Sequence, residues 1–565
     1  MTTETDPSFP FSVSPIGATS RIIRVVLILS ILGIVSILFI YLPIKTFPAD
    51  DALILFRYAE NLANTGVITF NPGATPVEGA TDFLWMILLA GFHVWGFNTW
   101  SAALFLSLLS LFGTAFLLYR LLNIRNKAIL LVLIIFFLVL ETTFSAIQGF
   151  STLFFGFFIM LTLYFNHENK PPLLYISGLI ASLIRPDGLV IVCPIILHNL
   201  YKNKAKVYQG AIQCIVIFFI PGIAYFIWRW SYFGLFFPLP FYIKNTYELI
   251  NVESLIVNIK FNLLYIVILF ILFIYLLFKR EIIPIRNIIF FILLLLPPFW
   301  FYSKVTLLQN VCHRFQYPFV IINIFMLISI VKNYKIKYPY VVLCLATILC
   351  ISSPQIYRAF LTTWYSQYAQ LYHIAKTISD KSIDALFLTT EAGVVPYYTR
   401  WKTIDAFGLN TPDYTKRVIS SQDVRAIEPD VVLINHMWDL YKFVDEGRDF
   451  SDFRSRSWQG MIKNIYKGLP SEEYDMFLIP VYNIIKLKND LLFQLPQLDS
   501  VFELSHDKMY YGIFIRNKFH SSQELKDIII SHNAVTYETF KNNLRPQIEK
   551  QIKESNLFPD LFPSD

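Results

Sequence analysis

The stretch "DDALILFRYAENLANTG" (residues 50–66) stands shortly after the first long apolar run of the chain, residues 21–43. Asp is favoured at the start of a helix and Gly just past its end, so this stretch predicts a helix that begins at Asp50. One carboxylate is enough to cap a helix, and two adjacent ones repel each other. A carboxylate at a membrane surface, partly shielded from water, also suits a general base toward a hydroxyl. Asp50 and Asp51 are therefore candidate catalytic residues, although capping alone explains one of them.

The composition indicates a polytopic membrane protein. The chain has 565 residues, of which 55% are hydrophobic and only 15% charged, whereas about a quarter of the residues are charged in soluble domains. The net charge of +7 is explained largely by Lys and Arg in cytoplasmic loops, so it gives no reason to expect a nucleic-acid partner.

Charge counting sets the predicted topology. Eleven apolar runs are candidate transmembrane helices: 21–43, 100–121, 128–144, 150–165, 172–184, 188–201, 210–230, 261–278, 286–303, 315–332 and 338–353. With the N-terminus in the cytoplasm, every inside loop is basic, as the positive-inside rule requires. This agreement requires that residues 82–97 lie as a helix in the outer membrane interface instead of crossing.

The predicted fold class is a polytopic α-helical membrane protein of about 11 spans with a C-terminal extracytoplasmic α/β domain. Residues 1–20 are expected to form a disordered cytoplasmic tail, and 21–353 a transmembrane domain whose first outer loop is 44–99. Residues 354–565 form the predicted α/β domain, because the short runs "DALFLTT", "PDVVLIN" and "YYGIFIR" alternate there with helical patterns.

Three cations are predicted on the outer side, where the charge rule does not require them: Arg185, Lys244 and Arg314. Such cations suit a phosphate group, especially one on a lipid already held in the bilayer. An ion pair of Arg185 with Asp187 that merely holds a hairpin explains that arginine equally well. The sequence has no HExxH or CxxC motif and no phosphate loop, so ATP and nucleotide sugars are not expected as substrates.

The longer segment "DDALILFRYAENLANTGVITFNPGATPVEGATDFLW" (50–85) resembles the opening motif of the GT-C superfamily of polyprenyl-phosphate-sugar glycosyltransferases. It is most similar to the family of the mycobacterial terminal arabinofuranosyltransferase and its bacterial relatives. Further landmarks follow in the same order: "RPDGL" (185–189), "YFGLFFPLPFYIK" (232–244), the Arg314 segment and "EAGVVPYYTRWKTIDAFGLN" (391–410). The chain departs from the family at Ser151, where relatives carry an acid, and at 238–240, where "PLP" replaces Pro-Asn-Thr.

The resemblance implies transfer of a sugar, with arabinofuranose favoured, from a polyprenyl-phosphate donor to a hydroxyl of a cell-envelope glycan or glycoprotein. It places the enzyme in the inner (plasma) membrane with its active site outside the cytoplasm. Asp50 is expected to be the base and Asp51 its partner, or the reverse, and a divalent cation at this pair is left open. The phosphate would be bound by Arg185, Lys244, Arg314 and His313. Contacts to the sugar or acceptor are expected from Arg57, Tyr58, Asn71, Glu78, Thr81, Asp187 and Asp405.

Two other function classes compete with this hypothesis. A lipid or sugar transporter or flippase is also polytopic, but such proteins tend to have repeated halves and broken helices near the midplane. The sequence shows neither. A sensor or scaffold that binds glycan without chemistry would not need the acidic pair.

Overall fold

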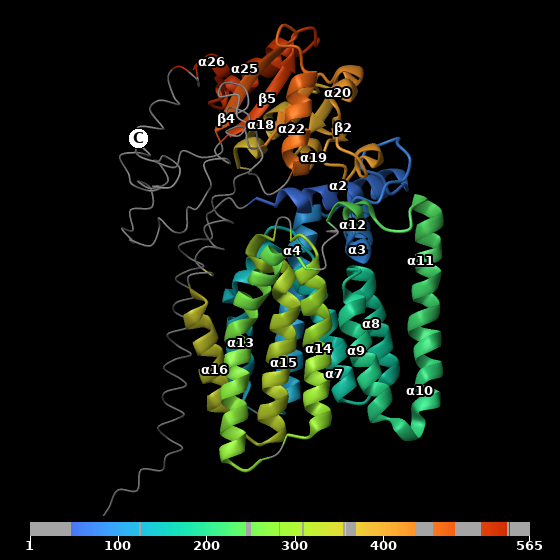
Figure 1. The fold of residues 1–565 in the computed structure, drawn as a ribbon, viewed down its shortest axis with the longest axis vertical. Coiled ribbons are helices and arrows are strands. Elements are labelled where there is room, and N and C mark those ends of the chain that lie inside the picture. The colour runs from blue at the N-terminus through green and yellow to red at the C-terminus, as the bar shows by residue number, and fades with distance from the viewer. Residues whose placement is uncertain are drawn as a thin grey trace, which may run out of the picture.

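The structure is a computed structural model, and it describes residues 47–123, 126–244, 250–281, 283–307, 310–353, 369–435, 456–480 and 510–539, with the single residues 356 and 542. The predicted tail 1–20 and the predicted span 21–43 lie outside these residues. The described part consists of a bundle of long helices and a sheet-containing domain at one end of the bundle (Figure 1).

Helix α2 (Asp50–Thr65) confirms the helix predicted from the opening stretch. It ends at Gly66, whose φ of 72° lies in the left-handed region that favours glycine. Figure 1 shows α2 running across the end of the long helices, between them and the sheet-containing domain. The following helix, α3 (Phe83–Val94), has 12 residues. At 1.5 Å per residue it is about 18 Å long, too short to cross a hydrocarbon core of about 30 Å.

The bundle contains a helix at the position of each predicted span that the structure describes. These elements are α4 (Thr99–Leu122), α5 (Lys127–Val139), η1 (Glu141–Thr143), α6 (Phe144–Ile147), α7 (Thr152–His167), α8 (Pro171–Ile184), α9 (Gly188–Lys202), η2 (Lys204–Lys206), α10 (Val207–Cys214), η3 (Ile215–Phe219), α11 (Ile220–Phe233), α12 (Leu239–Lys244), α13 (Val252–Phe278), α14 (Ile285–Lys304), η4 (Val311–Gln316), α15 (Tyr317–Asn333) and α16 (Tyr338–Ile351).

Not all of these helices are long enough to cross a membrane unaided. Among the described residues, five helices meet the length and composition for a span, or six if α5 and the bent segment Glu141–Ile147 count as one. Helices α7, α8, α9 and α16 are apolar but have only 14 to 16 residues. One cause is visible between α8 and α9, because Arg185 precedes a proline and adopts an extended conformation that ends α8.

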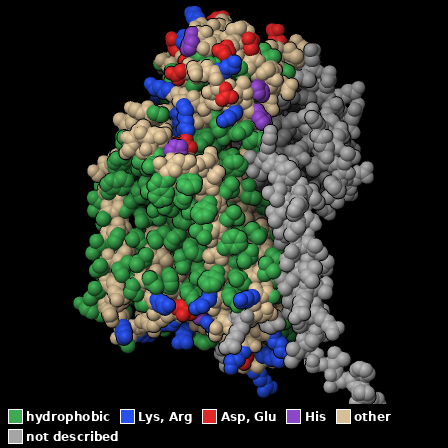
Figure 2. All heavy atoms as spheres, turned by 180° about the vertical axis from the view of Figure 1, so that it is seen from behind, with side chains coloured by type: hydrophobic (Ala, Val, Ile, Leu, Met, Phe, Trp, Pro, Cys, Tyr) green, Lys and Arg blue, Asp and Glu red, His purple; other side chains and the backbone are tan. Residues whose placement is uncertain are grey.

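The surface of the bundle is that of a membrane protein. Large apolar side chains are exposed along the long helices, among them Phe270, Ile271 and Leu263 on α13. Figure 2 shows a broad hydrophobic band, with Lys and Arg gathered at the end opposite the sheet-containing domain. This distribution is the one expected if the sheet-containing domain is extracytoplasmic, which stays a prediction.

The sheet-containing domain is an α/β domain, as predicted. Its six-stranded sheet has the order β2-β1-β3-β5-β4-β6, with β1 parallel to β2 and β3 and the other pairs antiparallel. The strands are β1 (Leu386–Thr389), β2 (Lys402–Asp405), β3 (Val431–Ile434), β4 (Tyr474–Pro480), β5 (Tyr510–Arg516) and β6 (Val535–Thr536). The helical elements are α18 (Ala369–Ser379), α19 (Val394–Thr399), η5 (Pro412–Tyr414), α20 (Ser421–Ile427), α22 (Arg456–Gly468), α25 (Ser522–Ser531) and α26 (Tyr537–Thr539). The three predicted strand runs correspond to β1, β3 and β5.

Candidate active site

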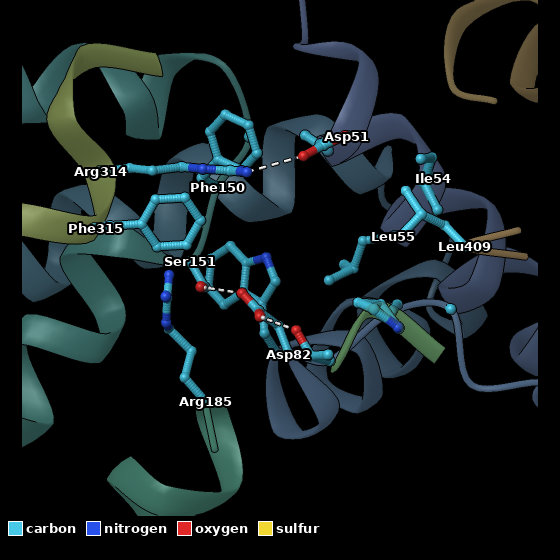
Figure 3. Close-up of a pocket in the computed structure, with 17 residues that line it drawn as sticks. Asp51, Ile54, Leu55, Asp82, Phe150, Ser151, Arg185, Arg314, Phe315 and Leu409 are labelled. Atoms are coloured by element: carbon cyan, nitrogen blue, oxygen red, sulfur yellow. Dashed lines mark hydrogen bonds and ion pairs between the residues drawn. The ribbon is translucent and has the colours of Figure 1, made fainter. Parts of the chain in front are cut away.

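A pocket lies where the N-terminal ends of α2, α3 and α7 meet, under the edge of the sheet-containing domain. Its polar lining consists of Asp51, Thr81, Asp82, Ser151, Arg185 and Arg314. Figure 3 shows Arg185 and Arg314 on one side and Ile54, Leu55 and Leu409 on the other. Leu409 is the lining residue contributed by the sheet-containing domain, so both parts of the molecule form this pocket.

The two arginines lie on opposite sides of one phenylalanine ring. The guanidinium carbon of Arg185 is 5.1 Å from the ring centre of Phe315, and that of Arg314 is 4.8 Å from it. Arg185 donates to Asp187 through Nε and Nη2, at 3.0 and 2.9 Å, and Asp187 also accepts from the hydroxyl of Tyr302. Asp187 therefore fixes the guanidinium of Arg185 by two hydrogen bonds and does not itself line the pocket.

The backbone before Arg314 is strained. Cys312 and His313 have φ values of 52° and 50°, in the left-handed region that residues with a Cβ rarely adopt. The imidazole Nδ1 of His313 lies 3.0 Å from Oε1 of Glu141, so His313 is placed outside the pocket. Arg314 enters it, with its guanidinium 3.8 Å from the ring centre of Phe150. Its Nη2 donates to Asp51 at 2.8 Å, and among the described residues its Nε has no partner.

The two adjacent aspartates serve different partners. Asp51 lines the pocket and pairs with Arg314. The carboxylate of Asp50 is buried and accepts hydrogen bonds from the backbone N–H groups of Gly393 and Val394, at 3.0 and 2.7 Å. It thus caps α19 of the sheet-containing domain. The two carboxylates are thus bound to different groups, and a divalent cation at this pair stays a prediction.

Because the carboxyl of Asp50 is buried, we expect the contact between α2 and α19 to depend on pH. Burial is the main cause that raises the pKa of Asp50 from 3.8 to about 7. Because the docked carboxyl binds its proton more tightly, its stabilising contribution is complete below pH 4 and is lost as the pH rises through about 7. We expect limited proteolysis of the sheet-containing domain to be faster at pH 8 than at pH 5, and Asp50→Asn to reduce this difference. An unchanged difference in the variant would contradict the role of Asp50.

Several other residues of the opening motif bind the sheet-containing domain instead of lining the pocket. Arg57 is buried and donates four hydrogen bonds: to Phe70 O at 2.7 Å, Trp401 O at 2.8 Å, Asn71 Oδ1 at 3.1 Å, and Pro396 O. Asn71 pairs with the backbone of Thr403 in both directions, accepting at 3.0 Å and donating at 2.8 Å. These contacts dock β2 and α19 on α2 and its following loop.

Tyr58 and Asp405 complete this docking surface. The hydroxyl of Tyr58 donates to Asn410 Oδ1 at 3.1 Å and accepts from the N–H of Gly79 at 3.0 Å. Asp405 is buried and accepts from both the backbone N–H and Nδ2 of Asn410, each at 2.9 Å. Burial raises the pKa of Asp405 to about 6. This chain of hydrogen bonds fixes the turn that brings Leu409 to the pocket.

Glu78 and Lys244 complete the predicted set. Glu78 is paired with Arg229 of α11, whose Nε donates to Oε1 at 2.8 Å, so its carboxylate is not in the pocket. Lys244 is the last residue of α12, and its side chain lies outside what the structure describes. The structure thus brings Asp51, Thr81, Arg185 and Arg314 together. The sequence analysis did not single out Asp82, which lines the pocket and directly precedes α3.

Comparisons with known proteins address the fold. A family model described as a domain of unknown function (DUF8728) matches residues 356–477. No curated protein matches the chain. The crystal structure of ArnT from Cupriavidus metallidurans in the apo state matches with 13% identity and a TM-score of 0.49, covering 76% of this chain and 95% of that one. The structure of the same protein bound to undecaprenyl phosphate matches with 12% identity and a TM-score of 0.50, covering 76% and 96%. ArnT is a GT-C glycosyltransferase.

The chain has a GT-C-like fold. The predicted superfamily resemblance is thereby confirmed at the level of the fold. In this GT-C-like chain, the match covers three quarters of the residues, so it extends over both the helical bundle and part of the α/β domain.

Proposed function

We propose that the chain is a membrane glycosyltransferase that moves a sugar from a polyprenyl-phosphate donor to a hydroxyl of a cell-envelope glycan or glycoprotein. The observation that carries this proposal is the pocket in which the carboxylate of Asp51 faces Arg314, with Arg185 across the ring of Phe315. Sugar transfer needs a base beside the acceptor and cations beside the leaving phosphate. The GT-C-like fold supports the donor class, since the similar ArnT structure is bound to undecaprenyl phosphate.

Each step of the transfer has a candidate group in the pocket. The acceptor hydroxyl gives its proton to Asp51 while its oxygen attacks the anomeric carbon of the donor sugar. The bond between that carbon and the phosphate oxygen breaks, and its electron pair leaves with the lipid phosphate. Arg185 and Arg314 stabilise the negative charge that grows on the phosphate. Asp51 takes the role of base, and Asp50 a docking role.

The ion pair of Asp51 with Arg314 implies an order of events, in which the donor binds before Asp51 acts as the base. In the absence of donor, Nη2 of Arg314 donates to the carboxylate of Asp51. A donor phosphate competes for the same guanidinium, whose unpartnered Nε offers a further donor. Donor binding would therefore loosen the pair and free the carboxylate of Asp51 to accept the proton of the acceptor hydroxyl. Lys244 stays a proposed additional phosphate contact, and arabinofuranose the favoured sugar.

A transfer assay with Arg314→Gln tests the proposal. The full-length protein in vesicles would be given an undecaprenyl-phosphate-linked arabinofuranose, labelled in the sugar, and a membrane glycan extract as acceptor. We expect transfer by the wild type and a loss of about 10²–10³-fold in kcat/KM for Arg314→Gln, the range for removing one group that stabilises developing charge. Arg417→Gln is the matched control, because Arg417 forms an exposed ion pair with Asp423 and does not line the pocket.

Two outcomes would contradict the proposal. Equal transfer by Arg314→Gln and Arg417→Gln would remove Arg314 from the phosphate site. Movement of the labelled lipid across the vesicle membrane without any glycosylated product would favour a transporter.

A further inference from the structure

Asp82 is placed as an N-cap but does not act as one. It immediately precedes α3, yet its side chain accepts no hydrogen bond from the first turn of that helix. Its carboxylate instead accepts from the hydroxyl of Ser151 and, at 3.3 Å, from the hydroxyl of Thr81. Figure 3 shows Asp82 and Ser151 joined in this way at the pocket. Asp at this position usually caps its own helix. The side chain of Asp82 instead contacts Ser151 at the pocket.

Ser151 likewise does not cap its own helix. It precedes α7, makes no side-chain cap bond to that helix, and donates to Asp82 instead. The pair therefore bridges the N-terminal ends of two helices, where the positive ends of the helix dipoles stabilise a carboxylate.

Asp82 differs from the other acids around the pocket in its partners. Asp51 is paired with Arg314, and Asp187 with Arg185. Within the described residues Asp82 forms no ion pair, and its oxygens accept hydrogen bonds from the neutral hydroxyls of Ser151 and Thr81. A carboxylate offers about four acceptor positions, so Asp82 keeps acceptor capacity for hydroxyl groups of a ligand.

Trp85 adds a second, independent observation at the same place. It follows Asp82 by three residues, which puts both on one face of the start of α3. Trp85 lines the pocket and is fully buried, and its indole Nε1 has no hydrogen-bond partner in the part of the chain that the structure describes. A buried N–H without a partner is costly unless a ligand supplies an acceptor.

We propose that Asp82, Ser151 and Trp85 form the subsite that recognises the hydroxyl groups of the donor sugar. Asp82 accepts from a sugar hydroxyl, the indole N–H donates to a sugar oxygen, and the hydroxyl of Ser151 holds the carboxylate in place. This inference rests on the proposed transfer function and names the part of the site that selects the sugar. Asp82 is a specificity-determining residue, distinct from Asp51, which takes the proton of the acceptor.

The experiment combines variants with deoxygenated donors. Undecaprenyl-phosphate arabinofuranose and its 2-deoxy, 3-deoxy and 5-deoxy forms would be tested with the wild type, Asp82→Asn and the matched control Asp380→Asn, an exposed Asp of the sheet-containing domain. We expect Asp82→Asn to raise KM for the full donor by about 10–100-fold, the range for a hydrogen bond to a charged group, and to change kcat by less than threefold. One deoxy donor should show the same loss with the wild type but no added loss with Asp82→Asn, because both changes remove one interaction.

A double variant that moves the carboxylate from position 82 to position 151 tests whether its place in the pocket matters. Asp82→Ser alone should raise KM as Asp82→Asn does, and the double variant Asp82→Ser/Ser151→Glu should recover at least part of the affinity by supplying the carboxylate from α7. Asp82→Asn behaving like Asp380→Asn would overturn the inference. A loss of kcat above 100-fold at unchanged KM would also overturn it, since Asp82 would then be the base.

A binding measurement separates this inference from the proposed function. Native mass spectrometry would compare undecaprenyl phosphate with and without the attached arabinofuranose. We expect the wild type to prefer the sugar-bearing lipid by at least fivefold and Asp82→Asn to lose this preference. Preferential binding without transfer by the wild type would overturn the proposed function and leave the subsite supported. Transfer without any effect of Asp82→Asn in either assay would overturn the subsite alone.

Discussion

Replacing Asp51 by Asn is expected to lower kcat for sugar transfer by about 10²–10⁴-fold, the range for loss of a general base. Asn keeps the size of the side chain but cannot take the proton of the acceptor hydroxyl. KM for the donor should not rise, because Arg314 loses its carboxylate partner and becomes fully available to the phosphate. Steady-state kinetics with the labelled donor would measure both constants.

Asp50→Asn is the matched comparison for Asp51→Asn, since the two residues are adjacent and chemically identical. Its carboxylate caps α19 through Gly393 and Val394 and does not line the pocket. We therefore expect Asp50→Asn to keep kcat within about tenfold of the wild type under conditions where the sheet-containing domain stays docked. A large loss of kcat with Asp50→Asn and normal kcat with Asp51→Asn would reverse the two roles.

Replacing Arg57 by Met should release the sheet-containing domain from α2. The substitution leaves the buried carbonyl groups of Phe70, Pro396 and Trp401 without this donor. Each of these carbonyls keeps one other donor, from Asn61 Nδ2, the N–H of Arg400 and the hydroxyl of Thr403. The cost is therefore the loss of four hydrogen bonds from one buried charged donor, and a destabilisation of about 4 kcal/mol is expected. Limited proteolysis and thermal unfolding would measure it.

Two controls define the result for Arg57. Arg57→Lys keeps one charge but cannot reach all four acceptors, so it should be intermediate. Arg417→Met removes an exposed arginine of the sheet-containing domain and should leave the resistance to protease close to that of the wild type. Wild-type resistance to protease in Arg57→Met would show that Arg57 does not hold the two parts together.

The sequence located the elements well because their signals are local. Apolar runs placed the bundle helices, and the Asp50 and Gly66 ends placed α2. The break at Arg185 between α8 and α9 could also be predicted, because the polar residues 185–187 separate the apolar runs 172–184 and 188–201.

Part of the pocket could also be predicted from the sequence. Arg185 and Arg314 stood out because the positive-inside rule does not account for cations on the outer side. Arg57, Tyr58 and Asn71 could not be assigned to docking, because their partners are carbonyls and amides more than 300 residues away in the chain. The different roles of Asp50 and Asp51 could not be predicted for the same reason, because the partners of Asp50, Gly393 and Val394, are also more than 300 residues away in the chain. Asp82 was not singled out, because its contact with Ser151 joins residues 69 positions apart in the chain.

The contacts of Asp50 and Arg57 with α19 also bear on how such proteins can be recombined. The boundary between the helical bundle and the sheet-containing domain follows the chain near residue 353, but the interacting surface crosses it. An exchange of the sheet-containing domain alone would present Asp50 and Arg57 to foreign backbone groups and would displace Leu409 from the pocket. The smallest transplantable unit therefore joins residues 47–85 to the sheet-containing domain, so that the acidic pair travels with the domain it anchors.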